Sequence, residues 1–304
     1  MSVSRLPKII SSIHGICPDI ACFQELDSST LPIIEAGICK EMSRAVFSVN
    51  ESLPARDGCG VFYNPHKFEL VGTDVVKMCN LLDKHLPSLG DYSRTTTSGM
   101  SLSRALYRET REKLNMAVFA KLKHIDTGKY LTVGSSHLYW NPAYPDIKLL
   151  QAYILARESV EIAPDHPVVL GVDLNSVPLS SGVYELLMGS GIVEASHRDH
   201  PVSLRSKNRA LEGVSAGVVP ELRNPIPFRS AMKDFFGTEP QYTNYTANFK
   251  GCLDYIMLRG DLRVSHAQTL PDEAALAAEV ALPNSMYPSD HLPLVIDLEF
   301  NPDS

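Results

Sequence analysis

The sequence of 304 residues lacks several features that would assign it to a membrane or to the cell exterior. No apolar run reaches the length that crosses a bilayer, and residues 1–15 have neither the apolar core nor the small-residue cleavage pattern of a secretory signal. The six cysteines form no C-x-x-C pair and no zinc-like spacing, and several stand in apolar stretches. These absences predict an intracellular protein of a reducing compartment, with cytoplasm and mitochondrion both open.

Basic residues are fewer than acidic residues. The chain has 28 Lys and Arg residues against 35 Asp and Glu residues, a formal charge of −7 at neutral pH. This balance excludes a generally cationic nucleic-acid coat protein. An acidic enzyme can still bind a polyanion where a metal ion and a few local basic side chains make the contact, so nucleic-acid enzymes stay open.

The patterning predicts one globular domain over residues 1–304. A hydrophobic content of 44% suits a sizeable core, and neither an internal repeat nor a linker divides the chain. We expect strands at residues 19–24, 59–63, 116–122, 130–135, 168–172, 253–258 and 292–298, and helices at 7–13, 145–162 and 182–188. Two polar stretches, residues 83–104 and 196–227, are expected to be long surface insertions. This alternation predicts an α/β (α+β) fold in which two packed mixed β-sheets are flanked by helices.

Five short polar motifs follow one another along the chain, most of them at or just beyond the carboxyl end of an expected strand. They are Gln24-Glu25, His137 to Pro142, Gly171 to Ser176, Lys250 to Ile256, and Ser289-Asp290-His291. Side chains that leave a buried sheet at such points can meet in one cleft. Carboxylate and amide oxygens bind hard divalent ions, and histidine transfers protons or contacts phosphate. The ordered set predicts a metal-dependent phosphodiesterase.

Four of these residues can be given roles from their chemistry. Glu25 ends an otherwise apolar strand, where a buried carboxylate is costly without a cation, so we expect a magnesium ligand; alone, it would be a solvated strand-end residue. Asp173 and Asn175 face the same side of an extended chain, so one can polarise the attacking water while the other binds phosphate or metal, although Asp-x-Asn is also a common turn. His291 suits a phosphate-side electrophile or acid oriented by a carboxylate, although Asp-His pairs are more often caps or surface pairs.

With these motifs in order, the sequence resembles the endonuclease/exonuclease/phosphatase superfamily. Within it, the sequence resembles the branch of carbon-catabolite-repressor-type deadenylases, Angel proteins and 2′-5′ oligoadenylate phosphodiesterases. The resemblance runs from about Pro7 to Phe300 and implies a four-layer α-β-β-α sandwich. It is most specific in His137-x-x-Trp140-x-Pro142, in Asp146-Ile147-Lys148-Leu149-x-Gln151, and in Tyr242-Thr243-Asn244-Tyr245-Thr246 followed by Phe249-x-Gly251. Gly251 to Ile256 and Pro288 to His291 are closer to the 2′-5′ phosphodiesterases, whereas Asp146 to Gln151 is closer to deadenylases and Angel proteins.

The resemblance implies further catalytic roles. Asp254 would orient His291, and Asp290 would bind the metal or support one of its ligands. His137 would stabilise charge on the scissile phosphate, with a satisfied strand-end histidine as the alternative.

The resemblance also implies how a base is held. The expected substrate contacts are Asn141, Pro142, Asn175, Tyr245 and Phe249. Pro142 and Phe249 would hold an adenine between them, because unpaired bases are bound by stacking on flat surfaces. Tyr245 is equally suited to packing, and Trp140, the only tryptophan, is expected to be a packing anchor rather than a base platform.

One departure from the family pattern lies at the start of the chain. Family members begin with a strand that carries a metal-binding asparagine, before the helix that precedes Pro18-Asp19. Here the chain enters that helix directly after Met1 to Arg5, so we expect the strand and its amide to be missing. Either the sequence is an incomplete version of a longer protein, or one metal ligand has been lost; the presence of every downstream catalytic residue favours the first.

We therefore expect a magnesium-dependent 3′-exoribonuclease, deadenylase-like and specific for poly(A), that releases 5′-AMP. It would use one or two Mg²⁺ ions, with Mn²⁺ as a substitute. Its partner would be single-stranded RNA, either poly(A) or 2′-5′ oligoadenylate. Three alternatives stay open: a 2′-5′ oligoadenylate phosphodiesterase, an Angel-like 2′,3′-cyclic phosphatase, and a non-catalytic RNA-binding or scaffold protein.

Overall fold

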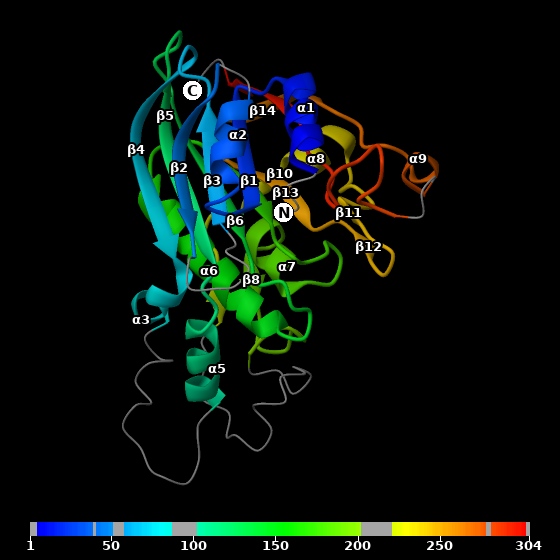
Figure 1. Cartoon of the computed structure of the whole chain (residues 1–304). Helices are drawn as coiled ribbons and strands as arrows, with labels where there is room; N and C mark the ends of the chain where they lie inside the picture. Colours follow the sequence, from blue (N-terminus) through cyan, green and yellow to red (C-terminus); the bar gives the residue numbers. More distant parts are fainter. Residues whose placement is uncertain are drawn as a thin grey trace.

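A six-stranded mixed sheet lies at the centre of the molecule (Figure 1). The computed structural model describes residues 5–38, 41–50, 58–86, 102–201, 221–277 and 281–301. The strands of the sheet follow the order β10 (Arg229–Ser230), β13 (Asp254–Arg259), β7 (Val168–Asp173), β6 (Tyr130–His137), β5 (Met116–His124) and β4 (Phe68–Lys77). β6 and β7 are parallel, and all other neighbours are antiparallel. β6 and β7 carry almost no charged side chains, as expected for strands covered on both faces.

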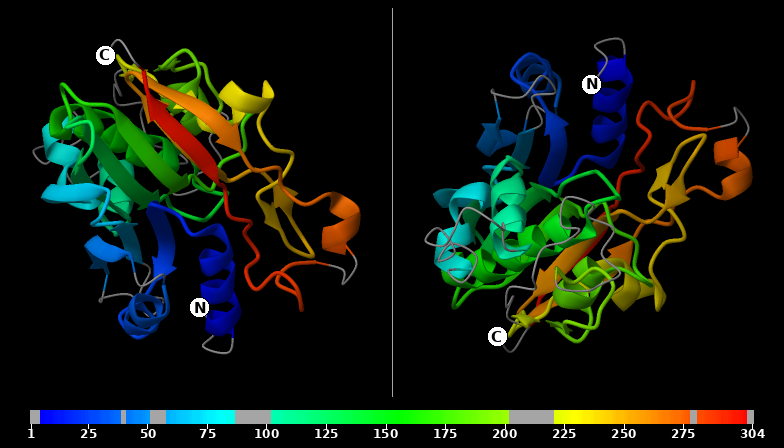
Figure 2. Two further views of the ribbon diagram at one scale, coloured as in Figure 1. Left: turned by 90° about the horizontal axis from the view of Figure 1, so that it is seen from above. Right: turned by 90° about the horizontal axis from the view of Figure 1, so that it is seen from below.

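Two smaller ladders cover one face of this sheet (Figure 2). One has the order β1 (Ile20–Leu26), β3 (Gly58–Tyr63) and β2 (Ser43–Val49); in the other, β14 (Leu262–Ala267) pairs with β15 (Ile296–Phe300). Both ladders contribute to one apolar cluster with the large sheet, in which Val61 meets Val118 and Val133. Within the described residues, β1 pairs only with β3, and β15 pairs only with β14.

Helices cover the opposite face of the large sheet. The long helix α6 (Pro145–Ile162) packs there with α7 (Gly182–Met188), α5 (Leu102–Arg111), α3 (Leu82–His85) and the 3-10 turn η2 (Met78–Asn80). α6 begins at Pro145, which lacks a backbone N–H, but the first turn of a helix leaves that N–H without an intrahelical partner in any case. The next residue is Asp146, and an acidic side chain is favourable at a helix N-terminus. α1 (Leu6–Ile16) and α2 (Leu31–Gly37) instead cover the outer side of the three-stranded ladder.

The remaining elements are short. They are the ladder β8 (Ile192–Val193) with β9 (Leu222–Arg223), the hairpin β11 (Asn244–Tyr245) with β12 (Lys250–Gly251), and the helices α8 (Ala231–Phe236) and α9 (Glu273–Ala277). The hairpin and α9 project to one side of the molecule (Figure 1). The hairpin matters for function because an isolated bridge joins Asn244 to His291.

The prediction of a mixed α/β fold is confirmed, and the helices expected at 145–162 and 182–188 have those bounds. The strand expected at 292–298 is wrong in its first half, since β15 begins at Ile296. Of the two expected insertions, residues 87–101 and 202–220 lie outside the described residues, while residues 102–111 form α5. This helix was not predicted, although its apolar and polar residues alternate with a helical period.

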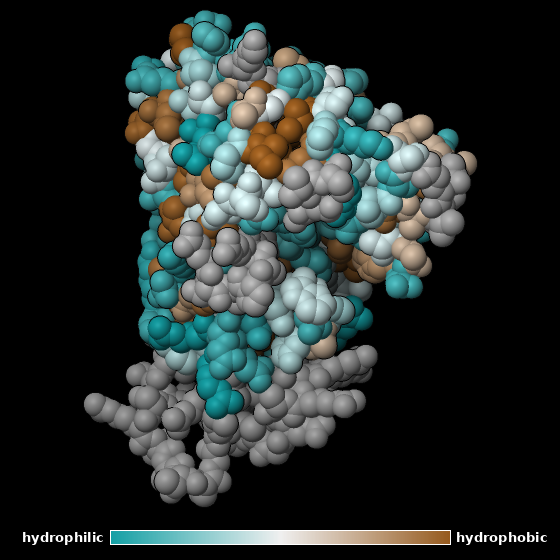
Figure 3. Space-filling model, viewed as in Figure 1, coloured by the Kyte–Doolittle hydropathy of each residue, from teal (hydrophilic) through white to brown (hydrophobic). Residues whose placement is uncertain are grey.

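The surface carries no extended apolar face on the side shown in Figure 3, where hydrophobic residues occur as separate patches. Scattered exposed apolar residues of this kind are normal in folded proteins. Among the described residues, no helix combines the length and the apolar character needed to cross a bilayer.

Candidate active site

Three titratable residues stand in one row at an end of the large sheet. His137 is the last residue of β6, Asp173 is the last of β7, and Asp254 is the first of β13. The strand register pairs His137 with Asp173 and Asp173 with Asp254. Because β6 and β7 run parallel and β13 starts where they end, the pairing of the strands alone brings these side chains together.

His291 joins the row from a distant segment. Its Nδ1 lies 2.8 Å from Asp254 Oδ2. The hydroxyl of Thr243 donates to the same carboxylate oxygen at 2.5 Å and accepts from the Asp254 backbone N–H at 3.0 Å, so the carboxylate is held from two sides. Burial alone would lower the pKa of His291, but the hydrogen bond that His291 donates to Asp254 and the nearby charges raise the pKa to about 10. His291 is therefore a cation at neutral pH.

Asp173 is the central and most buried carboxylate of the group. Its Oδ2 lies 3.4 Å from His137 Nε2 and 3.9 Å from His291 Nε2. Burial, together with the charge of Asp254, raises the pKa of Asp173 to about 6, although both histidines act in the opposite direction. A carboxylate of this kind can take up a proton near neutral pH, which suits a general base.

Asn175 follows Asp173 in a strained turn. Its backbone has φ of 48°, a left-handed conformation that is uncommon outside glycine. Its backbone N–H donates to Asp173 Oδ1 at 2.7 Å, and its side-chain Nδ2 lies 2.8 Å from His137 Nε2. The buried Lys148 donates to its carbonyl at 2.6 Å. Strain that is held by so many contacts is typical of functional sites.

The two other predicted metal ligands lie outside this row. Glu25 is exposed, with φ of 57°, at an irregularity in the pairing of β1 with β3. Its neighbour Gln24 points inward and donates to Ser135 Oγ and to the Gly171 carbonyl, both at 2.9 Å. Asp290 is half-buried, and its charge contributes to the raised pKa of His291. The structure thus places Glu25 and Asp290 on segments that flank the row.

The donor set at this end of the sheet suits a divalent cation. Ligand atoms of Asp173, Asp254 and His291 all lie within 4.8 Å of one another. Two carboxylates at such close range repel each other, which the raised pKa of Asp173 reflects, and a cation would relieve that repulsion. The carboxylate oxygens of Asp173 and Asp254 match the preference of Mg²⁺, and Glu25 and Asp290 are not part of this group.

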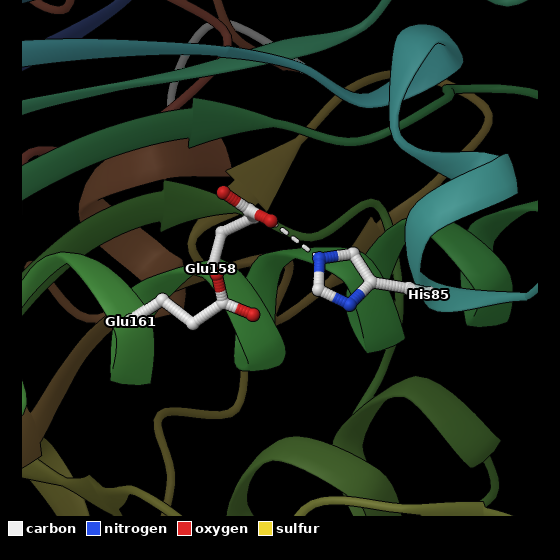
Figure 4. A group of neighbouring side chains, drawn as sticks. All are labelled: His85, Glu158 and Glu161. Carbon is white, nitrogen blue, oxygen red and sulfur yellow. Dashed lines mark hydrogen bonds and ion pairs between the residues drawn. The ribbon is translucent and has the colours of Figure 1, made fainter.

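A second group of metal-ligating residues lies on other elements. His85 of α3 faces Glu158 and Glu161 of α6 (Figure 4). The ammonium of Lys84 lies 2.6 Å from a carboxylate oxygen of each glutamate. A cation thus already bridges the two carboxylates, and the group acts as an ion-pair network that ties α3 to α6.

The predicted substrate residues lie on two separate loops. Asn141 and Pro142 follow β6, where the Asn141 side chain accepts from the Ala143 backbone N–H at 2.9 Å and fixes a turn. Tyr245 and Phe249 lie in and next to the β11–β12 hairpin, where residues 245–250 line a shallow hollow. Pro142 and Phe249 are both exposed, so each presents a flat surface to solvent.

Trp140 corrects one expectation. We predicted a packing anchor, but its side chain is 65% exposed. The neighbouring buried positions, Leu138 and Ile147, fill the core instead and leave no place for the indole.

Two supporting contacts were missed by the sequence reasoning. Thr243 holds Asp254, and Gln151 accepts from the Tyr139 backbone N–H at 2.8 Å while it donates to Asn115 at 3.0 Å. Both residues stand in strings that carry the family resemblance, but those strings suggested no role for them. The signal that could have found them is that each is a polar residue of a family motif to which no chemical role had been assigned.

The comparisons with known proteins show the family of the chain. The family model described as "Endonuclease/Exonuclease/phosphatase family" matches residues 3–291. The chain is 27% identical to the CCR4-Not complex 3′-5′-exoribonuclease subunit Ccr4 of Candida glabrata over 97% of this chain and 33% of that protein. It is 28% identical to 2′,5′-phosphodiesterase 12 of Homo sapiens over 96% of this chain and 45% of that protein. The chain thus spans a third to a half of the length of these relatives.

Solved structures give the same fold. The chain is similar to ANGEL2, a 2′,3′-cyclic phosphatase in complex with adenosine-2′,3′-vanadate, with a TM-score of 0.72 and 21% identity over 98% of this chain and 86% of that one. It is also similar to the human Nocturnin catalytic domain, with a TM-score of 0.63 and 19% identity over 99% of this chain and 88% of that one. Since the family model covers most of the sequence, the chain belongs to the endonuclease/exonuclease/phosphatase family.

Proposed function

We propose that this chain is a magnesium-dependent 3′-exoribonuclease that hydrolyses the phosphodiester bonds of adenylate RNA and releases 5′-AMP. The observation that carries the proposal is the convergence of Asp173 with the Asp254–His291 pair at one end of the sheet. It supplies a carboxylate with a pKa near neutrality beside a histidine that stays cationic. The 27% identity to an exoribonuclease subunit supports the choice of reaction.

The roles of the residues follow from their charge. Asp173 takes a proton from the water that attacks phosphorus, while the bond from phosphorus to the 3′ oxygen of the preceding nucleotide breaks and that oxygen takes up a proton. His291 offers a positive charge to the phosphoryl oxygens, and Asp254 fixes its ring. His137 would stabilise charge on the same phosphate, and Asn175, whose Nδ2 lies 2.8 Å from His137 Nε2, would contact phosphate or sugar. A bound Mg²⁺ would add charge that offsets the negative transition state.

The fold and setting complete the proposal. We propose a single domain over residues 1–304, in which the β1–β3–β2 and β14–β15 ladders are parts of the second sheet of a four-layer α-β-β-α sandwich. Pro142 and Phe249 would stack on the terminal adenine, with Asn141, Asn175 and Tyr245 around it. The protein would act on single-stranded RNA inside the cell.

The 2′,5′-phosphodiesterase relatives support a second candidate with the same chemistry and a different linkage. The chain is as similar to 2′,5′-phosphodiesterase 12 as to the exoribonuclease subunit, with 28% and 27% identity over almost the whole chain. The row of catalytic residues suits either linkage, because both reactions displace a ribose oxygen from phosphorus. This chain is connected to ANGEL2, which is described as a 2′,3′-cyclic phosphatase, by a likeness of fold alone.

The test is product release from labelled 3′-5′ oligo(A) and 2′-5′ oligo(A), each with Mg²⁺ and with EDTA. We expect Mg²⁺-dependent release of AMP, faster from the 3′-5′ substrate. Asp173→Asn should abolish it, whereas Asp74→Asn, an exposed carboxylate on β4, should leave it unchanged. Faster turnover of the 2′-5′ substrate would select the second candidate. Binding of oligo(A) without turnover by folded protein would point to the RNA-binding alternative.

A further inference from the structure

An exposed tryptophan lies close in sequence to a residue of the candidate active site. Trp140 is the only tryptophan of the chain, and its side chain is 65% exposed. It lies three residues after His137, in the loop that follows β6. Large exposed aromatic side chains next to a phosphate-handling centre are the surfaces on which unpaired bases stack.

An unusual lysine lies next to this loop. The Lys113 ammonium is 5.0 Å from the ring centroid of Tyr139 and 5.7 Å from that of Tyr144. Within the described part of the chain, no carboxylate forms an ion pair with Lys113. Its position is therefore set by aromatic rings rather than by an acidic partner, and its charge stays available for an anion. In a chain with a net charge of −7, a cation in this position is notable.

Hydrogen bonds attach both residues to the catalytic row. Asn115, two residues after Lys113, donates to the His137 carbonyl at 3.0 Å. The fully buried Gln151 bonds Asn115 at 3.0 Å and the Tyr139 backbone N–H at 2.8 Å. This clamp fixes the segment that carries Lys113 against the loop that carries Trp140.

The two groups are close enough to bind one strand together. The indole centroid of Trp140 is 6.1 Å from the Tyr139 centroid, and the Lys113 ammonium is 5.0 Å from the same centroid, so ammonium and indole are at most about 11 Å apart. The structure therefore places an aromatic face and a cation within about 11 Å of each other, and such a combination binds single strands without reading their sequence.

We propose that Trp140 and Lys113 form a second nucleotide subsite that holds the single strand upstream of the scissile phosphate. A base stacks on the Trp140 indole, and a backbone phosphate contacts the Lys113 ammonium. This inference rests on the proposed function and adds to it a preference for chains longer than a dinucleotide. The subsite is separate from the terminal-base position at Pro142 and Phe249.

The fluorescence of the single tryptophan tests the stacking directly. The full chain carrying Asp173→Asn, which prevents turnover, is titrated with 3′-5′ oligo(A) hexamer and with AMP in Mg²⁺. We expect the hexamer to quench the emission and AMP to leave it nearly unchanged. Lys113→Met should weaken hexamer binding about tenfold. Lys121→Met is the matched control, because its ammonium lies over the Tyr130 ring at 5.2 Å on β5.

Turnover gives the second measurement, the ratio of kcat/KM for the hexamer to kcat/KM for the dinucleotide. Trp140→Ala and Lys113→Met should each lower this ratio about tenfold, and Trp140→Phe should restore most of it. Phe236→Ala, which removes another exposed ring on α8, should leave the ratio unchanged. An equal loss for both lengths, or no quenching, would overturn the subsite while leaving the proposed function intact. Quenching without any turnover would support the subsite and refute the proposed function.

Discussion

Asp254 controls the charge state of the candidate active site more than any other single residue. It accepts hydrogen bonds from Thr243 and from His291 on the same oxygen, at 2.5 and 2.8 Å. An imidazolium beside an ionised carboxylate keeps its proton, so His291 stays charged at pH values where free histidine is neutral. Asp254 thus determines the charge that His291 presents to a substrate.

Replacing this carboxylate should therefore lower the pKa of His291. In Asp254→Asn the pKa should fall well below about 10, because burial is then opposed only by the charges of Asp173 and Asp290. Histidine NMR chemical shifts followed over pH in metal-free protein measure it. Asp290→Asn is the matched control and should lower the pKa less, since Asp290 contributes the weakest of the charges. A His291 pKa that is unchanged in Asp254→Asn would contradict the assignment.

The raised pKa of His291 also predicts how the stability of the fold depends on pH. The folded-state pKa of His291 is above its ordinary value of 6.5, so its contribution is complete below pH 6.5 and disappears as pH rises toward 10. In urea unfolding, the difference between the unmodified chain and Asp254→Asn should accordingly be larger near pH 6 than near pH 9.5.

Lys148 shows how a buried cation can act through another residue. Its ammonium donates to the Asn175 carbonyl at 2.6 Å, and burial lowers its pKa despite the charges of Asp199 and Asp173. Lys148→Met should lower kcat about 10- to 100-fold with little change in KM, because the strained turn at Asn175 loses its support. Lys148→Arg should recover part of the rate. Lys84→Met, which removes two ion pairs between α3 and α6, should leave kcat unchanged.

At the scale of elements, strand register accounts for most of what the sequence could predict about the site. The motifs end β6 and β7 and begin β13, and sequence patterns locate such strand ends well. The sequence could not predict that His137, Asp173 and Asp254 lie directly opposite one another, because pairing depends on contacts between distant segments. Glu25 illustrates the limit: a β-bulge turns its side chain outward, and no local pattern announces the bulge.

The contact between the three-stranded ladder and the large sheet depends on a glycine. A Cβ at Gly171 would lie 2.7 Å from the Cys22 Cβ, and Gln24 bonds the Gly171 carbonyl at 2.9 Å. Gly171→Ala should therefore destabilise the fold by about 1–3 kcal/mol and disturb the adjacent Asp173. Gly72→Ala on β4 is the matched control, because nothing lies within 4 Å of its added Cβ. Chemical denaturation of both variants measures the difference in the free energy of unfolding. Equal free energies of unfolding would show that the three-stranded ladder can move away from the large sheet at no cost in stability.

At the scale of the whole molecule, the apolar core and the polar residues of the candidate active site occupy different regions. Three apolar clusters join the helices, the ladders and the large sheet, while the polar residues of the site gather where the strands end. The composition could predict a mixed fold with a large core, since such a pattern follows from local periodicity. It could not predict that the second layer consists of two ladders, because that division depends on which strand edges meet.

The charge of the whole site leads to the last prediction, which concerns metal and pH together. Asp173 has a pKa of about 6, so a proton competes with a divalent cation for its carboxylate below that pH. Mg²⁺ that binds only the folded chain raises its Tm by mass action. The rise should be clear near pH 8, smaller near pH 5.5, and absent in Asp173→Asn at both values, whereas Asp74→Asn should behave as the unmodified chain. A rise that is equal at both pH values, or that survives in Asp173→Asn, would place the cation away from the end of the sheet. The group of His85, Glu158 and Glu161 would then be the next one to replace, because its ligand atoms also lie within 4.8 Å of one another.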